Sequence, residues 1–313
     1  MHTMLIVASE GDEVAPGIEL EAAGRSDVGR ERERNEDQFL IATLQQTMHV
    51  VDTSVTYDPL RWLPSGGKGI LMLVADGMGG TGSGDVASSV AVRTITNYLC
   101  NVVPATQAVV PSQSPLRQST IPGMRQGLKK ALEKGDDEVR RAAESKGTSD
   151  TMGTTLTMAY VRWPHLYVAH VGDTRCYLYR DEELFQLTTD HTLAEQLRER
   201  TKMEVDDSSP WHHVLWNALG GGETPSAEPQ IIRRKLLPTD GVLLCSDGLN
   251  KHVSDEEITV ALRASSSAED ACKRLVAMAN ADGGEDNITV LVARSREAAS
   301  EAETAPTLRR PKR

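Results

Sequence analysis

Acidic side chains stand at the ends of several short apolar runs in this chain. Such runs are typical of buried strands. The acidic residues are Glu36 and Asp37 ahead of residues 39–41, Asp76 after residues 71–75, Asp173 after residues 166–172, Asp247 after residues 242–246, and Asp286 ahead of residues 288–293. A carboxylate at the end of a buried strand is costly unless its charge is neutralised, and several at one end of a sheet would repel one another. Divalent cations remove both costs, and an all-oxygen donor set predicts Mg²⁺ or Mn²⁺ rather than Zn²⁺.

Such a centre suits the hydrolysis of phosphate esters. Two hard cations about 3.5–4 Å apart can hold a hydroxide nucleophile and a phosphoryl oxygen together, and phosphate esters are among the slowest compounds to hydrolyse unaided. Glycines adjoin three of the acidic residues, at Gly77, Gly172 and Gly248, and let the backbone come close enough for a carbonyl to bind an ion. A single Asp-Gly pair is commonly only a turn, so the hypothesis depends on the whole set.

The elements that must position these residues follow from the hydrophobic pattern. Apolar runs predict buried strands over 70–75, 241–245 and 288–293, and near-regular short runs over 155–187 predict an antiparallel meander. Helical spacing of apolar residues covers 84–101, 124–145 and 191–200, and Ser254 with Glu257 forms a capping box ahead of a further helix. Ser267 is expected to begin the last helix, and residues 102–123 to form a loop. The prediction is an α+β fold in which two antiparallel sheets pack face to face beneath outer helices.

The same pattern sets the expected domain boundaries. Residues 1–20 are predicted to be an acidic lead-in, residues 21–294 one folded domain, and residues 295–313 a disordered tail with a basic end. The domain is expected to be a monomer.

Composition narrows the classes of function. The 313 residues carry a formal net charge of −11, which disfavours general binding of nucleic acids and a nuclease function. No run approaches the roughly 18 apolar residues of a membrane span. The four cysteines, Cys100, Cys176, Cys245 and Cys272, are far apart, so we expect them to be reduced and the protein to be cytoplasmic.

Seven short motifs then follow one another along the chain. They are Ser26-Asp27-x-Gly29-x-x-Arg32-x-x-Asn35-Glu36-Asp37, Val74-Ala75-Asp76-Gly77-Met78-Gly79-Gly80, Gly153-Thr154-Thr155, Val171-Gly172-Asp173-Thr174-Arg175, Asn217-Ala218-Leu219-Gly220, Ser246-Asp247-Gly248-Leu249 and Asp286-Asn287-Ile288-Thr289-Val290. Each motif is weak alone, but their order over residues 24–293 resembles the type-2C, metal-dependent protein serine/threonine phosphatases, the PPM family, in its bacterial form.

That resemblance implies an αββα sandwich and a role for each matching residue. Asp76 would bridge two core Mn²⁺ or Mg²⁺ ions, the Gly77 carbonyl would bind one of them, and Asp247 and Asp286 would bind the other. Glu36 and Asp37 would bind the ions directly or through water, and Asp173 with Asp247 would form a weaker third site. Arg32 would bind the substrate phosphate. An arginine suits that task because its planar fork pairs with phosphate oxygens. The charge pattern alone does not distinguish Arg32 from Arg30 or Arg34.

The implied reaction is hydrolysis of phosphoserine or phosphothreonine in proteins by a metal-bridged water, without a phosphoenzyme. The implied partners are phosphorylated proteins, substrates of a Ser/Thr kinase. Met78 stands where some eukaryotic members have a histidine proposed as general acid, so the proton donor stays open. Segments 44–69 and 102–123 are longer than usual. His212 and His213 fall in residues 201–230, the family's flap, where we expect packing or solvent exposure rather than metal binding.

Two alternatives remain at this point. The fold could serve as a pseudophosphatase, that is, a regulatory or binding module, although every expected acidic residue is present. The same centre could also act on small phosphomonoesters.

Overall fold

The computed structural model describes residues 4–7, 18–44, 47–54, 63–64, 69–79, 82–106, 120–148, 151–202, 205–206, 209–221 and 226–297. Its strands are β1 (Met4–Val7), β2 (Ile18–Asp27), β3 (Gln38–Leu44), β4 (Thr47–Thr53), β5 (Leu63–Pro64), β6 (Gly69–Ala75), β7 (Gly77–Met78), β8 (Gly153–Thr154), β9 (Leu156–Arg162), β10 (His165–Val171), β11 (Arg175–Arg180), β12 (Glu183–Gln186), β13 (Gln230–Lys235), β14 (Gly241–Cys245) and β15 (Ile288–Glu297). Its helices are α1 (Gly84–Thr106), α2 (Thr120–Lys146), α3 (Leu193–Thr201), α4 (Asp247–Asn250), α5 (Asp255–Ala264) and α6 (Ala268–Ala281), with a 3₁₀ turn η2 (Pro210–His213).

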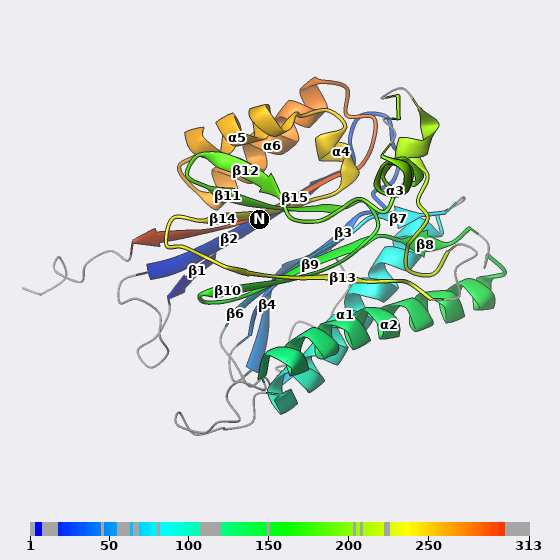
Figure 1. Cartoon of the computed structure of the whole chain (residues 1–313), viewed down its shortest axis with the longest axis horizontal. Helices are drawn as coiled ribbons and strands as arrows, with labels where there is room; N and C mark the ends of the chain where they lie inside the picture. Colours follow the sequence, from blue (N-terminus) through cyan, green and yellow to red (C-terminus); the bar gives the residue numbers. More distant parts are fainter. Residues whose placement is uncertain are drawn as a thin grey trace, which may run out of the picture.

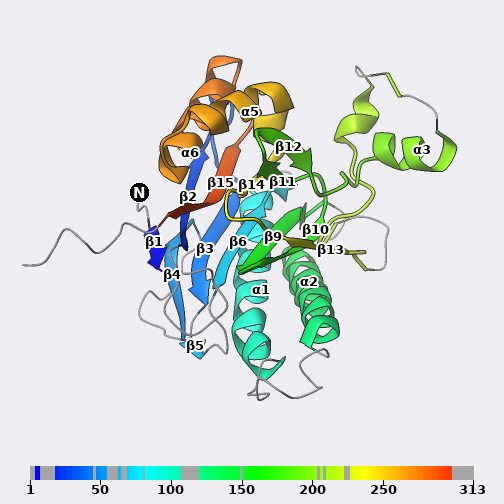
Figure 2. The same cartoon turned by 60° about the vertical axis from the view of Figure 1, so that its left-hand side comes forward.

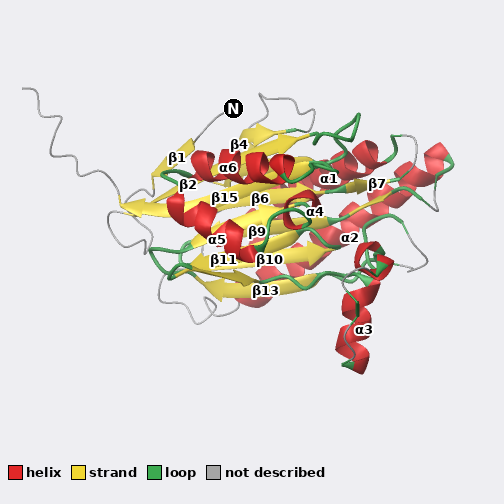
Figure 3. Cartoon of the chain, turned by 90° about the horizontal axis from the view of Figure 1, so that it is seen from above, coloured by secondary structure: helices red, strands yellow, loops and turns green. Residues whose placement is uncertain are grey.

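Two antiparallel sheets form the centre of the molecule, as predicted. One has the order β1-β2-β15-β14-β11-β12 and the other the order β13-β10-β9-β6-β3-β4-β5, while β7 and β8 make a short separate pair. Helices α1 and α2 cover the outer face of the seven-stranded sheet, and α5 and α6 cover that of the six-stranded sheet (Figures 1 and 2). Seen from above, α5 and α6 lie across the upper sheet, and α3 projects from one edge (Figure 3).

Strand β6 shows why the central strands are apolar throughout. Side chains alternate between the two faces of a strand. Ile70, Met72 and Val74 therefore enter the core between the sheets, whereas Leu71 and Leu73 face the core beneath α1 and α2. All of these side chains are buried. A polar side chain would therefore be unfavourable on either face of β6, and the first acidic residue, Asp76, comes directly after the strand.

Helices α5 and α6 begin where the sequence predicts. Ser254 and Glu257 form the expected capping box at α5, and the Ser267 side chain accepts a hydrogen bond from the Asp270 amide at the start of α6. The four cysteines are free and buried, as expected. No helix among the described residues is long and apolar enough to cross a membrane.

Several predicted boundaries need correction. Strand β1 and the first residues of β2 lie inside the supposed lead-in, and β15 continues to Glu297, beyond the predicted domain end at 294. The short run of β1 is stable because it pairs with residues 19–22 of β2, a contact that periodicity does not reveal. The supposed loop over 102–123 is partly helical, since α1 reaches Thr106 and α2 begins at Thr120. Pro122 is tolerated there because the first turn of a helix needs no amide donor.

The long segment 44–69 contributes edge strands rather than only a loop. Strand β4 pairs with β3, and β5 pairs with β4. Residues 55–62, 65–68, 107–119 and 298–313 lie outside the described part of the chain, and with them most of the predicted tail.

Candidate metal and phosphate site

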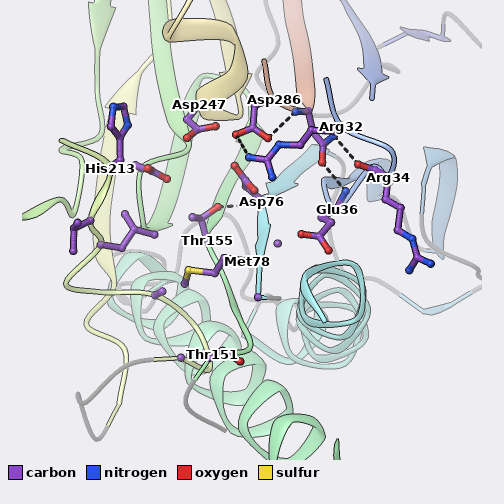
Figure 4. A pocket seen from close by; sticks show the side chains of 18 of the residues that line it. Arg32, Arg34, Glu36, Asp76, Met78, Thr151, Thr155, His213, Asp247 and Asp286 are labelled. Atoms are coloured by element: carbon purple, nitrogen blue, oxygen red, sulfur yellow. Dashed lines mark hydrogen bonds and ion pairs between the residues drawn. The ribbon is translucent and has the colours of Figure 1, made fainter. Parts of the chain in front are cut away.

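The acidic residues meet because of the antiparallel order of the strands. The carboxyl end of β6 lies beside the amino end of β3, and the carboxyl end of β14 lies beside the amino end of β15. Strand β10 runs in the same direction as β6, because β9 pairs antiparallel with both. The predicted residues thus gather at one end of the sandwich, around a cavity of about 1000 Å³ whose lining includes Arg32, Glu36, Asp76, Asp173, Asp247 and Asp286 (Figure 4).

Asp76 is held at the end of β6 by two threonines. Its amide donates to Thr155 Oγ1 at 3.0 Å, and its carbonyl accepts from the Thr155 amide at 2.9 Å and from Thr154 Oγ1 at 2.8 Å. These bonds use the backbone and leave the carboxylate facing the cavity. Burial, together with the neighbouring carboxylates of Asp37 and Asp247, holds the pKa of Asp76 well above its ordinary value.

Asp37 lies behind the cavity and is almost wholly buried. Its Oδ2 accepts hydrogen bonds from Ser246 Oγ and Thr289 Oγ1, both at 2.7 Å. Burial raises the pKa of Asp37 to about 7, although the two hydroxyl donors oppose the shift. Its Oδ1 and Oδ1 of Asp247 are buried without a hydrogen-bond partner. Two orphaned carboxylate oxygens beside one cavity are the donors that a cation requires.

Gly77 occupies a position where no other residue fits. A Cβ on this residue would lie 2.1 Å from the Gly84 carbonyl oxygen and 2.8 Å from the Glu36 carbonyl oxygen. The Gly77 amide donates to that Glu36 carbonyl at 3.2 Å, which also accepts from Ser88 Oγ at 2.6 Å. Burial and the nearby charge of Asp85 raise the pKa of Glu36. The backbone around Gly77 is therefore packed tightly against the start of α1.

Two basic residues, Arg32 and Lys251, contact the carboxylates of Asp247 and Asp286. Arg32 Nη2 lies 2.9 Å from Asp286 Oδ2, and Lys251 Nζ lies 2.5 Å from Asp247 Oδ2 and 3.3 Å from Asp286 Oδ2. Asp173 follows β10, and burial and Asp247 raise its pKa to about 8.

The residues present fit a hard-cation centre, although they are not arranged in a finished coordination shell. Within the described part of the chain, no three His, Cys, Asp or Glu side chains stand close enough together to hold an ion as they are. Arg32 and Lys251 each form an ion pair with one of these carboxylates, Asp286 and Asp247 respectively. The all-oxygen donor set and the two orphaned oxygens match Mn²⁺ or Mg²⁺.

Sequence reasoning missed the residues that support this site. Ser246 and Thr289 lie within two of the sequence motifs, but the motifs predict no role for them. Their hydrogen bonds to Asp37 join residues more than 200 positions apart in the sequence. Asn287 also escaped notice: its side chain accepts from the Glu36 amide and donates to the carbonyls of Val28 and Arg34. Lys251 could have been found, because it stands four residues after Asp247 in a helical turn.

The flap histidines differ from each other. His213 lines the cavity, while His212 Nε2 lies 3.2 Å from the Asp206 carbonyl oxygen. Trp216 packs on His191, with ring centroids 5.1 Å apart.

A two-sheet sandwich that carries an acidic, oxygen-rich cavity at one end defines the class of the metal-dependent phosphatases. The family profile described as protein phosphatase 2C matches residues 45–291. The chain belongs to this family.

Characterised relatives agree. The serine/threonine phosphatase stp of Listeria welshimeri is 33% identical over 224 residues, which cover 71% of this chain and 83% of that protein. PstP of Mycobacterium tuberculosis is 34% identical over 225 residues, which cover 71% of this chain and 40% of PstP. The crystal structure of M. tuberculosis PstP/Ppp has a TM-score of 0.65 at 31% identity, covering 88% of this chain and 98% of that one. The PstP catalytic domain in complex with two manganese ions has a TM-score of 0.62 at 30% identity, and the match covers 90% of this chain and 100% of that domain.

Proposed function

We propose that this chain is a metal-dependent phosphatase that removes phosphate from phosphoserine and phosphothreonine in proteins. The observation that carries the proposal is the convergence of five predicted carboxylates and Arg32 at one cavity, with Asp37 buried behind it, in a chain of the protein phosphatase 2C family. The manganese ions of the related PstP domain support a centre of two core cations.

Each residue at the cavity has a proposed task. Asp76, the Gly77 carbonyl, Glu36, Asp37, Asp247 and Asp286 would hold two Mn²⁺ or Mg²⁺ ions. The family resemblance alone would add a third, weaker site at Asp173 and Asp247. When bound, such ions activate water for attack and neutralise charge on phosphoryl oxygens. Ser246 and Thr289 orient Asp37, and Thr154 and Thr155 fix Asp76, so the chain itself sets the positions of the donors.

Arg32 would bind the phosphate of the substrate. Its side chain is 54% exposed at the cavity and now pairs with Asp286. With Asp286 engaged as a metal ligand, the guanidinium would be able to form paired hydrogen bonds with two phosphate oxygens. Because the reaction requires charge neutralisation rather than covalent chemistry by the protein, positioning and electrostatics suffice.

The test is a phosphatase assay on p-nitrophenyl phosphate and on a phosphothreonine peptide, with Mn²⁺, Mg²⁺ or EDTA. We expect release of phosphate from both compounds with either metal and none with EDTA. Asp76→Asn and Asp247→Asn should each lower the rate by more than about 100-fold, because even losing a hydrogen-bond partner of a metal ligand costs about 10–100-fold. Asp137→Asn, on the exposed face of α2, is the matched control and should keep full activity.

The two substrates separate the alternatives. A folded, metal-loaded chain with no turnover on either compound would contradict the phosphatase and favour a regulatory module. Turnover of p-nitrophenyl phosphate and other small esters, with none of several phosphopeptides, would contradict the protein substrate alone.

A further inference from the structure

Lys251 places a fixed positive charge inside the carboxylate cluster. It follows the short helix α4, and its amide donates to the Asp247 carbonyl at 2.9 Å, which turns the side chain back over Asp247. Its Nζ then lies 2.5 Å from Asp247 Oδ2 and 3.3 Å from Asp286 Oδ2, and the side chain is only 27% exposed. The bond to Asp247 is the shorter one, and Asp286 Oδ2 is shared with Arg32, so Asp247 is the main partner of Lys251.

Lys251 also borders the space beside Asp173. Asp173, Asp247 and Lys251 together line a second cavity of about 550 Å³ that adjoins the first. A divalent ion held by Asp173 and Asp247 would have to compete with Lys251 for the Asp247 carboxylate. The ion would also be repelled by the Lys251 ammonium, which cannot move far because α4 holds the lysine backbone. Both effects weaken binding of an ion at this position.

The core positions differ in this respect. Of the proposed core ligands, Asp247 and Asp286 share these basic partners. Among the described contacts, Asp76, Glu36 and Asp37 form no ion pair with a lysine or arginine, and Oδ1 of Asp37 and of Asp247 has no hydrogen-bond partner. A core cation thus has three ligands without a basic partner, whereas a cation beside Asp173 would depend on Asp247, the main partner of Lys251.

We propose that the Lys251 ammonium serves as a built-in cation in place of a third metal ion beside Asp173 and Asp247, so that this chain binds two divalent cations and not three. The inference rests on the metal centre of the proposed function and deepens it. It changes the expectation for Asp173, which would face the charge of Lys251 across the second cavity rather than bind a weak third ion.

The experiment is equilibrium dialysis against increasing free Mn²⁺, followed by metal analysis, for the wild type, Lys251→Met and Lys251→Arg. Methionine keeps the length of the side chain without its charge, and arginine keeps the charge. The wild type and Lys251→Arg should reach two ions per chain, whereas Lys251→Met should take a further, weaker ion and reach three. Circular dichroism would verify that each variant is folded.

A second readout does not depend on bound metal or on activity. In EDTA, Lys251→Met should melt about 2–4 °C below the wild type, because the carboxylates lose a neutralising partner, and Lys251→Arg should melt close to the wild type. Three ions in the wild type, or two in a folded Lys251→Met, would overturn the inference. A wild type that binds no Mn²⁺ would instead overturn the metal centre of the proposed function, and the inference with it.

Discussion

Single hydroxyl groups determine how the buried Asp37 presents its free oxygen. Ser246 Oγ donates to Asp37 Oδ2 and accepts from the Thr289 amide, so it fixes the orientation of the carboxylate. We predict that Ser246→Ala weakens Mn²⁺ binding by about 10–100-fold, as other losses of ligand-orienting bonds do. Calorimetric titration measures this change.

Ser265→Ala is the matched control for that substitution. Ser265 is also buried, but its hydroxyl donates to the Ala261 carbonyl at the end of α5, away from the cavity. Its loss should leave the affinity for Mn²⁺ unchanged. Equal effects of the two variants would show that Ser246 acts only through general stability.

The structure also distinguishes Arg32 from Arg30, which the charge pattern left equivalent, whereas Arg34 lines the cavity as well. Arg32 reaches the cavity and pairs with Asp286, whereas the described contact of Arg30 is a backbone bond to the Gly284 carbonyl. We predict that Arg32→Ala lowers kcat/KM for a phosphopeptide by about 100-fold. Removing a hydrogen-bond donor that stabilises charge in the transition state commonly lowers the rate by about 10²–10³-fold. Arg30→Ala should stay within about 3-fold of the wild type. Steady-state kinetics at saturating Mn²⁺ would refute the assignment if Arg30→Ala showed the larger loss.

At the scale of elements, most of the fold follows from hydrophobic pattern. Strand β6 and its neighbours were predictable because a short run of apolar residues is typical of a strand buried on both faces. The helices were predictable because their capping residues agree with the spacing of their apolar residues. Strands β1, β4 and β5 were not predictable, since their stability depends on partners already in place at the sheet edges. The same limit applies to the site: aspartates at strand ends are visible in the sequence, but the packing that brings Ser246 to Asp37 is not.

The buried Asp136 of helix α2 binds two backbone amides of the flap, residues 201–230. Asp136 accepts from the Gly220 amide at 2.7 Å and from the Ala227 amide at 3.1 Å, and it pairs with Arg140. Removing its carboxylate leaves two buried amides without acceptors, each costing about 1–3 kcal/mol. We therefore predict that Asp136→Ala lowers the free energy of unfolding by about 2–4 kcal/mol, measured by urea denaturation.

The neighbouring acid on α2 offers a control for that prediction. Asp137 is 52% exposed and lies near Lys134, so Asp137→Ala should change stability by less than about 0.5 kcal/mol. An Asp136→Ala variant as stable as Asp137→Ala would show that the two amides find other acceptors, and that α2 does not hold this segment.

Over the whole molecule, the cavity joins the two sheets. Glu36, Asp37, Asp76 and Asp173 adjoin strands of the seven-stranded sheet, whereas Asp247 and Asp286 adjoin strands of the six-stranded sheet. Repulsion between these groups therefore opposes the packing of one sheet on the other at this end. Cations bound between them would reverse that effect, so metal binding and global stability should be coupled.

This coupling should be visible as a dependence of stability on pH. In the metal-free chain the pKa of Asp37 is raised to about 7 and that of Asp173 to about 8, whereas both carboxyls titrate near 4 when unfolded. Between these limits the folded chain binds more protons than the unfolded chain, so stability falls as pH rises. We predict that the melting temperature in EDTA decreases from pH 5.5 to pH 8.5, by about 2–4 °C for each kcal/mol lost, and that the gain from Mn²⁺ grows over the same range. Asp37→Asn, which lacks one titrating group, should show a shallower slope in EDTA. Calorimetry in which the metal-free chain grows more stable toward pH 8.5 would contradict the repulsion on which the cation centre depends.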